Sequence, residues 1–200
     1  MTKPKPIVER PVLHHVTFKT TRLQEMQDWY ETVVGCKPSF SAPIAAWTTN
    51  DTANHRIAFL ALPGIEEDPD KIKHANMHHT AFEFGTHQAL FDNYERLADG
   101  GILPVICLDH GLTMSFYYAD PDDNLVELQA DNFGNWVHST RWMQISEDFK
   151  NNPIGVEVDP PKMIKALKDG MALSDLLKAS RSGDFLPETP GKSFLPTPAA

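Results

Sequence analysis

Cysteine is scarce in this chain, and basic side chains and long apolar runs are also few. Only Cys36 and Cys107 occur among 200 residues, which excludes a disulfide framework but leaves a single bond possible. Lysine and arginine number 18 against 27 aspartate and glutamate, and the net charge of −9 argues against nucleic acid as a partner. No apolar run is long enough to cross a membrane, and residues 1–11 contain no signal-peptide core, so we expect a cytoplasmic protein with no membrane partner.

A short histidine-containing pattern occurs twice. The segment His14–Phe18 (HHVTF) is echoed by His78–Phe82 (HHTAF), and in both copies a Tyr-Glu pair begins fifteen residues after the second histidine. A glycine closes each stretch, at Gly35 and at Gly100. Such self-similarity indicates two copies of one supersecondary unit. Histidines at matched positions would place two imidazoles on equivalent strands, which is one way for a pseudo-symmetric protein to build a metal site.

Each copy predicts the same order of elements: a strand, a helix and then three strands. Alternating β-forming residues predict the strands, and apolar residues three or four apart predict the helices. In the first copy only two of the later strands are evident, because Pro38 and Pro43 predict a turn. The expected elements are a strand at 12–19, a helix at 22–33 and strands at 44–49 and 55–62, then a strand at 78–84, a helix ending at Gly100, and strands at 102–108, 113–119 and 124–130.

The composition changes between the copies and again after them. The charged, proline-containing stretch 63–76 is expected to link the two copies. Beyond residue 132 the pattern predicts helices at about 160–168 and 173–179. From Ser182 the chain is rich in proline, glycine and serine, and it cannot bury enough apolar surface to fold alone. We expect this tail to wrap the domain or a partner subunit, or to be loose.

The histidine pairs and one carboxylate are candidate metal ligands. Alternate side chains of a strand share a face, so His14 and His15 are expected to point to opposite sides, and parity alone does not say which one faces a site. Glu127 lies within the apolar segment 124–128, and a buried carboxylate needs a partner, either a salt bridge or a metal ion. Two histidines and a carboxylate form the facial triad of non-haem Fe(II) oxygenases, although imidazole also suits zinc, nickel or manganese.

Together these motifs resemble the vicinal-oxygen-chelate superfamily and, within it, the type I extradiol ring-cleavage dioxygenases. The resemblance covers about residues 10–132 and rests on the two HHxxF motifs and on the segment 120–127, DPDDNLVE. It implies an α+β fold in which two βαβββ modules, at about 10–62 and 77–130, form one cupped eight-stranded mixed sheet around a metal. The domains that we therefore expect are the metal-binding domain at 1–132 and a helical extension with a proline-rich tail at 133–200.

The resemblance also implies a ligand set. In the family pattern the second histidine of each pair binds the metal, which gives His15, His79 and Glu127 as ligands. The expected cofactor is Fe(II), with Mn(II) as the alternative. Counting the 48 residues from His79 to Glu127 forward from His15 leads to Pro63, where no ligand stands. Because glyoxalases of the same fold use a fourth ligand that ends the first module, this absence favours three ligands, with room for a bidentate substrate and dioxygen.

Three further residues have counterparts in the family pattern. His55, within the segment 53–59, matches the acid–base histidine, and His110 matches a second active-site histidine in a His-Gly loop. Tyr117 matches a tyrosine just before the Asp-Pro turn, and its neighbour Tyr118 must face the other way. The chain departs from the pattern at Asp123, where glycine is usual. Aspartate tolerates left-handed geometry, so we expect an effect on the turn rather than on catalysis.

The function that the resemblance implies is extradiol, or meta, cleavage of a catecholic substrate by dioxygen, a step of aromatic hydrocarbon catabolism. His55 would act as general base, His110 would stabilise the developing anionic oxygen, and Tyr117 would hydrogen-bond the substrate. The expected partners are the catechol, dioxygen and further copies of this chain in a homo-oligomer, a dimer or higher. Two alternatives stay open: a metal-dependent isomerase or lyase of the glyoxalase type, and a non-catalytic module that sequesters a small molecule.

Overall fold

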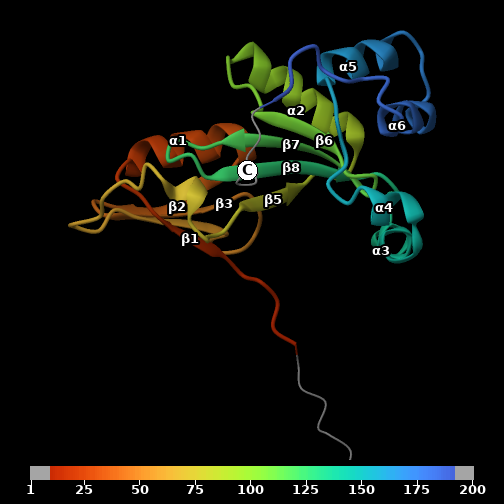
Figure 1. Ribbon diagram of the computed structural model, residues 1–200. Coiled ribbons are helices and arrows are strands. Elements are labelled where there is room, and N and C mark those ends of the chain that lie inside the picture. Colours follow the sequence, from red (N-terminus) through yellow and green to blue (C-terminus); the bar gives the residue numbers. More distant parts are fainter. Residues whose placement is uncertain (1–9, 192–200) are drawn as a thin grey trace, which may run out of the picture. The chain divides into compact units, whose positions relative to one another are not determined.

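The computed structural model describes residues 10–191, which fall into two compact units that divide between Glu67 and Asp68. The division lies within the stretch that was predicted to link the two copies. Each unit contains one β-sheet and a helix that follows its first strand (Figure 1). The predicted α+β class and the two βαβββ modules are confirmed, and each unit is described by itself below.

The first unit is a four-stranded sheet with one helix. Its elements are β1 (Val16–Lys19), α1 (Leu23–Val34), β2 (Lys37–Ala42), β3 (Ala45–Thr49) and β4 (Ile57–Leu60), with the strands in the order β1-β4-β3-β2. Strands β1 and β4 are parallel, whereas the other neighbours are antiparallel. Tyr30 of α1 is fully buried against the rings of Phe18 and Phe59, so the helix covers one face of the sheet. Gly35 ends α1 in the left-handed conformation, with φ of 73°.

Two strands of the first unit differ from the prediction. Strand β1 begins at Val16 rather than at residue 12, so the first histidine pair lies just before the strand. Strand β2 was missed, because Pro38 and Pro43 predicted a turn. It is one of the two edge strands of the sheet, where proline is tolerated because one side of the strand needs no partner, and its register shifts between Pro38 and Phe40.

The second unit contains a five-stranded sheet. Its elements up to residue 131 are a short 3₁₀ helix at Lys71–Lys73, β5 (His79–Glu83), α2 (His87–Asp99), β6 (Ile106–Asp109), β7 (Thr113–Ala119) and β8 (Leu125–Asp131). Strands β5 and β8 are parallel, as β1 and β4 are in the first unit. The order is β5-β8-β7-β6-β9, in which β9 (Val156–Glu157) comes from the extension and was not predicted. The strand expected at 102–108 begins only at Ile106.

The two faces of the second sheet differ in chemistry. Helix α2 lies along one face of this sheet (Figure 1). Its Phe91 and Tyr94 pack their rings against Phe116 of β7. Side chains of a strand alternate between faces, so the neighbours of Phe116 point to the other side of the sheet. Two of these are polar and buried: Ser115 is 0% exposed and Tyr117 is 6% exposed. The face opposite α2 therefore contains a buried polar surface on β7, which is where a site can form.

The predicted helical extension has four helices within the described residues. They are α3 (Trp136–Ile145), α4 (Glu147–Asn151), α5 (Pro160–Lys168) and α6 (Leu173–Arg181). Helix α5 begins as expected, with the Asp159 side chain accepting a hydrogen bond from the backbone of Lys162. Beyond α6, Phe185 is buried and its carbonyl accepts from the Asp159 backbone, so this part of the tail packs on the unit. The rest of the tail, 192–200, lies outside the described residues.

The turn before β8 is held by one buried carboxylate. Asp120, 3% exposed, accepts hydrogen bonds from the backbone N–H groups of Asp122 and Asn124. Asp123, where glycine is usual in the family pattern, has φ of 58° and is the one non-glycine residue with positive φ among those described. The turn therefore keeps the left-handed geometry without glycine.

Neither cysteine forms a disulfide, since Cys36 and Cys107 are both free and buried. In residues 10–191, no helix is long and apolar enough to span a bilayer.

Candidate functional site

Glu127 is the centre of the buried polar surface in the second unit. It lies in the middle of β8 and is 5% exposed. The β-sheet register places it beside Ala81 of β5 and Tyr117 of β7, so residues of the same parity on these strands share its face. His79 Nε2 is 3.1 Å from Oε2 of Glu127, and the Tyr117 hydroxyl donates to Oε1 at 3.0 Å. The carboxylate thus has the polar partners that a buried charge requires.

The surroundings of Glu127 keep it ionised. Burial by itself would raise the pKa of this carboxyl group, but hydrogen bonds from His79, Ser115 and Tyr117 outweigh burial and leave the pKa below its ordinary value. Ser115 is a fully buried neighbour on β7 that the sequence analysis did not single out. At neutral pH the site therefore contains a buried anion facing an imidazole, which is a chemically suitable pair of ligands for a divalent cation.

His110 joins the same group of side chains. It follows β6, and its Nε2 is 2.9 Å from the Tyr117 hydroxyl and 4.0 Å from Oε1 of Glu127. Burial lowers the pKa of the His110 imidazole, partly offset by the charge of Glu127, so the ring is neutral at neutral pH. Burial also raises the pKa of Tyr117, reinforced by the negative charge of Glu127, and this phenol keeps its proton.

The choice between the two adjacent tyrosines follows from the register. Tyr117 pairs with Glu127, whereas Tyr118 pairs with Val126 and so faces the opposite side. Tyr118 is 1% exposed, and burial raises its pKa. The structure therefore brings Tyr117, and not Tyr118, to the polar surface.

The first unit holds the other two predicted residues. The rings of His15 and His55 are 4.3 Å apart between centroids, and His14 lies against both of them. The expectation that His14 and His15 point to opposite sides is wrong, because both precede β1 and strand alternation does not apply there. Burial and the neighbouring imidazoles lower the pKa of His55, which favours its neutral form. Within the described residues, His14, His15 and His55 are also a group whose ligand atoms all lie within 4.8 Å.

The position equivalent to Glu127 in the first unit is Ala58. In the second unit Ala81, two residues past His79, pairs with Glu127, and in the first unit Thr17, two residues past His15, pairs with Ala58. Counting along the sequence pointed to Pro63 instead, and this was wrong because the first module has shorter connections between its strands. Ala58 offers no ligand atom, so the register still leaves the first module without an equivalent of Glu127.

Comparison with known proteins gives the family of the chain. The model of the Glyoxalase/Bleomycin resistance protein/Dioxygenase superfamily matches residues 12–128. Biphenyl-2,3-diol 1,2-dioxygenase 2 of Rhodococcus globerulus is 37% identical over 180 residues, which cover 90% of this chain and 94% of that protein. Biphenyl-2,3-diol 1,2-dioxygenase 3 of the same organism is 37% identical over 169 residues, covering 83% and 87%. This chain belongs to the Glyoxalase/Bleomycin resistance protein/Dioxygenase superfamily.

A solved structure supports the fold. The glyoxylase/bleomycin resistance protein/dioxygenase domain from Frankia sp. EAN1pec aligns with a TM-score of 0.54 at 17% identity, covering 65% of this chain and 98% of that one. The resemblance that the repeated histidine motifs suggested is thus confirmed for the family and for the fold.

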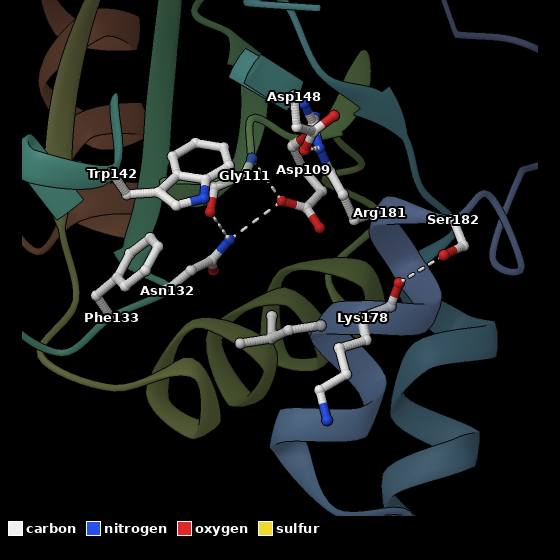
Figure 2. A pocket seen from close by; sticks show the side chains of 10 residues that line it. Asp109, Gly111, Asn132, Phe133, Trp142, Asp148, Lys178, Arg181 and Ser182 are labelled. Carbon is white, nitrogen blue, oxygen red and sulfur yellow. Dashed lines mark hydrogen bonds and ion pairs between the residues drawn. The ribbon is translucent and has the colours of Figure 1, made fainter. Parts of the chain in front are cut away.

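Several contacts around the site could not be read from the motifs. Asp109, 1% exposed, accepts hydrogen bonds from Gly111, Asn132 and Ser180, and the Ile154 carbonyl lies 2.6 Å from Nδ1 of His110. Figure 2 shows Asp109 and Asn132 at a pocket that is also lined by Trp142 and Arg181. The one available signal was Asp109 itself, a carboxylate that ends an apolar strand directly before His110.

The metal-free protein is expected to become more stable as the pH rises from about 5 to 7.5. Burial, first of all, lowers the pKa of His55, His78 and His110 below the imidazole reference value of 6.5. The unfolded chain has ordinary imidazoles and therefore binds more protons than the folded chain, so the free energy of unfolding increases with pH. The stability that these histidines contribute is fully present above pH 6.5 and decreases as the pH falls below that value. Urea denaturation across this range measures the slope. A flat or falling stability curve would contradict the assignment of neutral histidines.

Proposed function

We propose that this protein is an extradiol dioxygenase, which opens the ring of a catecholic substrate beside its two hydroxyl groups with dioxygen. The observation that carries the proposal is the pair of half-buried His79 and buried Glu127, with Nε2 and Oε2 3.1 Å apart, in a chain 37% identical to two proteins named biphenyl-2,3-diol 1,2-dioxygenases. The pair combines an imidazole nitrogen with an ionised carboxylate oxygen, both of which are ligand types for a divalent cation. Both proteins are matched over most of their length, which supports a shared type of reaction.

The proposed metal ligands are His15, His79 and Glu127, and the proposed metal is Fe(II), with Mn(II) as the alternative. Two imidazoles and one carboxylate are the donor set of non-haem Fe(II) oxygenases, so these residue types fit the group. The low pKa of Glu127 means that no proton has to be displaced from the carboxylate when a cation binds. Tyr117, hydrogen-bonded to Glu127 Oε1, orients the carboxylate from the opposite side to His79.

The absence of a ligand at Ala58 supports three protein ligands rather than four. A fourth ligand in the first module would occupy a coordination position, as in the glyoxalase type of site. Ala58 carries only a methyl group and supplies no ligand atom, so in this proposal the fourth position is left to non-protein ligands. A bidentate catechol together with dioxygen needs three such positions. The proposal for ring cleavage and the lack of a second carboxylate are therefore consistent.

In this proposal Fe(II), when bound, would lower the pKa of the catechol hydroxyls and let electrons pass from the ring to dioxygen. The residues of the chain move protons and position the oxygen atoms. His55, whose lowered pKa keeps the imidazole neutral, accepts a proton from a catechol hydroxyl and later returns it. Tyr117 donates a hydrogen bond to a substrate oxygen, and His110 stabilises the oxygen on which negative charge develops.

The experiment that tests the proposal is anaerobic purification, addition of Fe(II), and a panel of catechols that includes 2,3-dihydroxybiphenyl. We expect dioxygen uptake, measured with an oxygen electrode, together with a new visible absorbance from the ring-opened product. A matched pair of variants tests the ligand assignment, because His78 and His79 are neighbours with contacting rings. His79→Ala is expected to lose metal and turnover, whereas His78→Ala keeps both.

The other outcomes point to the competing functions. Turnover of a carbonyl substrate with Ni(II) or Zn(II) and without dioxygen uptake would indicate an isomerase or lyase. Binding of small molecules with no turnover under any metal would indicate a sequestering module. No dioxygen uptake across the catechol panel, or full activity in His79→Ala, would overturn the proposal.

A further inference from the structure

The His110 ring is held on one side by the C-terminal extension. Its Nδ1 is 2.6 Å from the carbonyl oxygen of Ile154, which lies 44 residues further along the chain. A carbonyl oxygen can only accept a hydrogen bond, so Nδ1 must be the protonated nitrogen in this contact. The other nitrogen, Nε2, is 2.9 Å from the Tyr117 hydroxyl, on the side of Glu127. The two ring nitrogens thus face different parts of the second unit.

We propose that the extension fixes His110 as its Nδ1–H tautomer, so that the neutral ring presents Nε2 to the active site as a hydrogen-bond acceptor. A neutral imidazole carries only one N–H group, and the Ile154 carbonyl takes it. Nε2 is then an acceptor. The single Tyr117 proton is donated to Glu127, so Nε2 accepts a hydrogen bond only when that proton turns toward His110 or when a substrate hydroxyl supplies one. For His110 to stabilise an anionic oxygen as a donor, Nε2 must first receive a proton from one of those hydroxyls. The catalytic part of this inference rests on the proposed dioxygenase function, whereas the tautomer itself does not.

The backbone that carries the Ile154 carbonyl is held in place by the side chains of Asn152 and Arg181. Asn152 closes the turn, since its Nδ2 donates to the Gly155 carbonyl at 2.8 Å and its Oδ1 accepts from the Gly155 N–H at 3.0 Å. Arg181, at the end of α6, donates to the carbonyl oxygens of both Asn152 and Asp109, each at 3.1 Å. One guanidinium therefore links the turn to the residue directly before His110.

The other flank of His110 is held by Asp109. This buried carboxylate accepts from the Gly111 N–H at 2.7 Å and from Asn132 Nδ2 at 3.1 Å, and Ser180 of α6 donates to its second oxygen. Figure 2 shows Asp109 and Asn132 joined in this way, with Asn132 also bonded to the Gly111 carbonyl. The residues before and after His110 are thus both held by a network that includes α6.

A glycine permits the close approach of the turn. Gly155 has φ of 101°, and a Cβ atom at this position would overlap the Asp109 carbonyl and the His110 Cα. Any side chain here must push the turn, and with it the Ile154 carbonyl, away from the His110 ring. Gly155, Asn152 and Arg181 are therefore positioning residues, which act on the reaction only through His110.

The test is the protonation of His110 in the full chain, observed by ¹⁵N–¹H NMR of histidine-labelled protein and assigned with a His110→Gln variant. We expect the Nδ1–H tautomer to dominate in the unmodified protein, both without metal and with diamagnetic Zn²⁺. Gly155→Ala and Arg181→Gln are expected to shift the ring toward the Nε2–H form. Lys178→Gln, an exposed change on the same helix, is the matched control and should leave the signal unchanged.

The kinetic arm separates this inference from the proposed function. If the protein cleaves a catechol, Gly155→Ala should lower kcat by about 10–100-fold with KM unchanged, as expected for a partner that orients a catalytic group. An Nε2–H tautomer in the unmodified protein, or the same Nδ1–H population in Gly155→Ala and Arg181→Gln, would overturn the inference. Absence of turnover with an Nδ1–H signal would instead reject the dioxygenase proposal alone. Should Gly155→Ala fail to fold, Arg181→Gln decides.

Discussion

Replacing Glu127 by glutamine is expected to abolish metal binding and to lower dioxygen uptake by at least about a thousand-fold, which corresponds to about 4 kcal/mol. Glutamine keeps the shape of the side chain and can still accept a hydrogen bond from Tyr117, but it removes the one negative charge of the proposed ligand set. A divalent cation held by two neutral imidazoles and an amide loses most of its electrostatic stabilisation. Metal analysis after dialysis and an oxygen electrode measure the two effects.

The matched control is Glu83→Gln in the neighbouring strand. Glu83 is an exposed carboxylate on β5, and its replacement changes the net charge by the same amount as the first variant. It should leave both metal content and dioxygen uptake unchanged. Equal loss in the two variants would mean that overall charge, and not coordination, controls metal binding. Retention of metal and turnover by Glu127→Gln would remove Glu127 from the ligand set.

Replacing His55 by alanine is expected to lower turnover by about 10²- to 10⁴-fold while the metal content stays unchanged. His55 is proposed to act as the base, and the lowered pKa of its imidazole makes the proton-accepting form dominant at neutral pH. Without it, water must take the catechol proton, and the low-pH limb of the pH–rate profile that reports this base should disappear. Iron content and a pH series of kcat/KM measure these effects.

The control for His55 is its ring neighbour. The His14 and His55 rings are 5.4 Å apart, so His14→Ala removes an imidazole from the same place without touching the proposed base. We expect it to retain turnover. Loss of metal in both His55→Ala and His14→Ala would show instead that the cation is held by the three neighbouring histidines of the first unit. The pair of variants therefore separates a base from a ligand.

The elements with local signals in their own residues could be predicted from the sequence. Helix α1 was expected at 22–33 and is found at Leu23–Val34, because its apolar spacing and Gly35 determine both the face and the end of the helix. Strand β2 could not be predicted, since Pro38 argues against a strand unless the strand lies at an edge. Whether a strand lies at an edge depends on the pairing of the whole sheet, and no local pattern contains this information.

The same distinction holds for the site. The buried position of Glu127 followed from its place in an apolar segment, and Tyr117 was chosen because it matches the family pattern; both are signals contained in short segments. The contacts of His110 with Ile154 and of Asp109 with Ser180 join residues 44 and 71 positions apart. Helix α3, with Trp136 and Val137 mostly exposed, lacks the buried stripe by which helices are recognised. The role of the extension therefore became visible only from tertiary contacts.

Strand β9 has a consequence for solubility. It consists of two residues, yet it pairs with Leu108 and Asp109 on the outer side of β6 and occupies the hydrogen-bonding groups that an edge strand would otherwise present. Unpaired edges are templates on which strands of other molecules can add, and natural proteins cover them for this reason. The extension thus protects this edge of the sheet from association with the strands of other chains, in addition to its contact with His110.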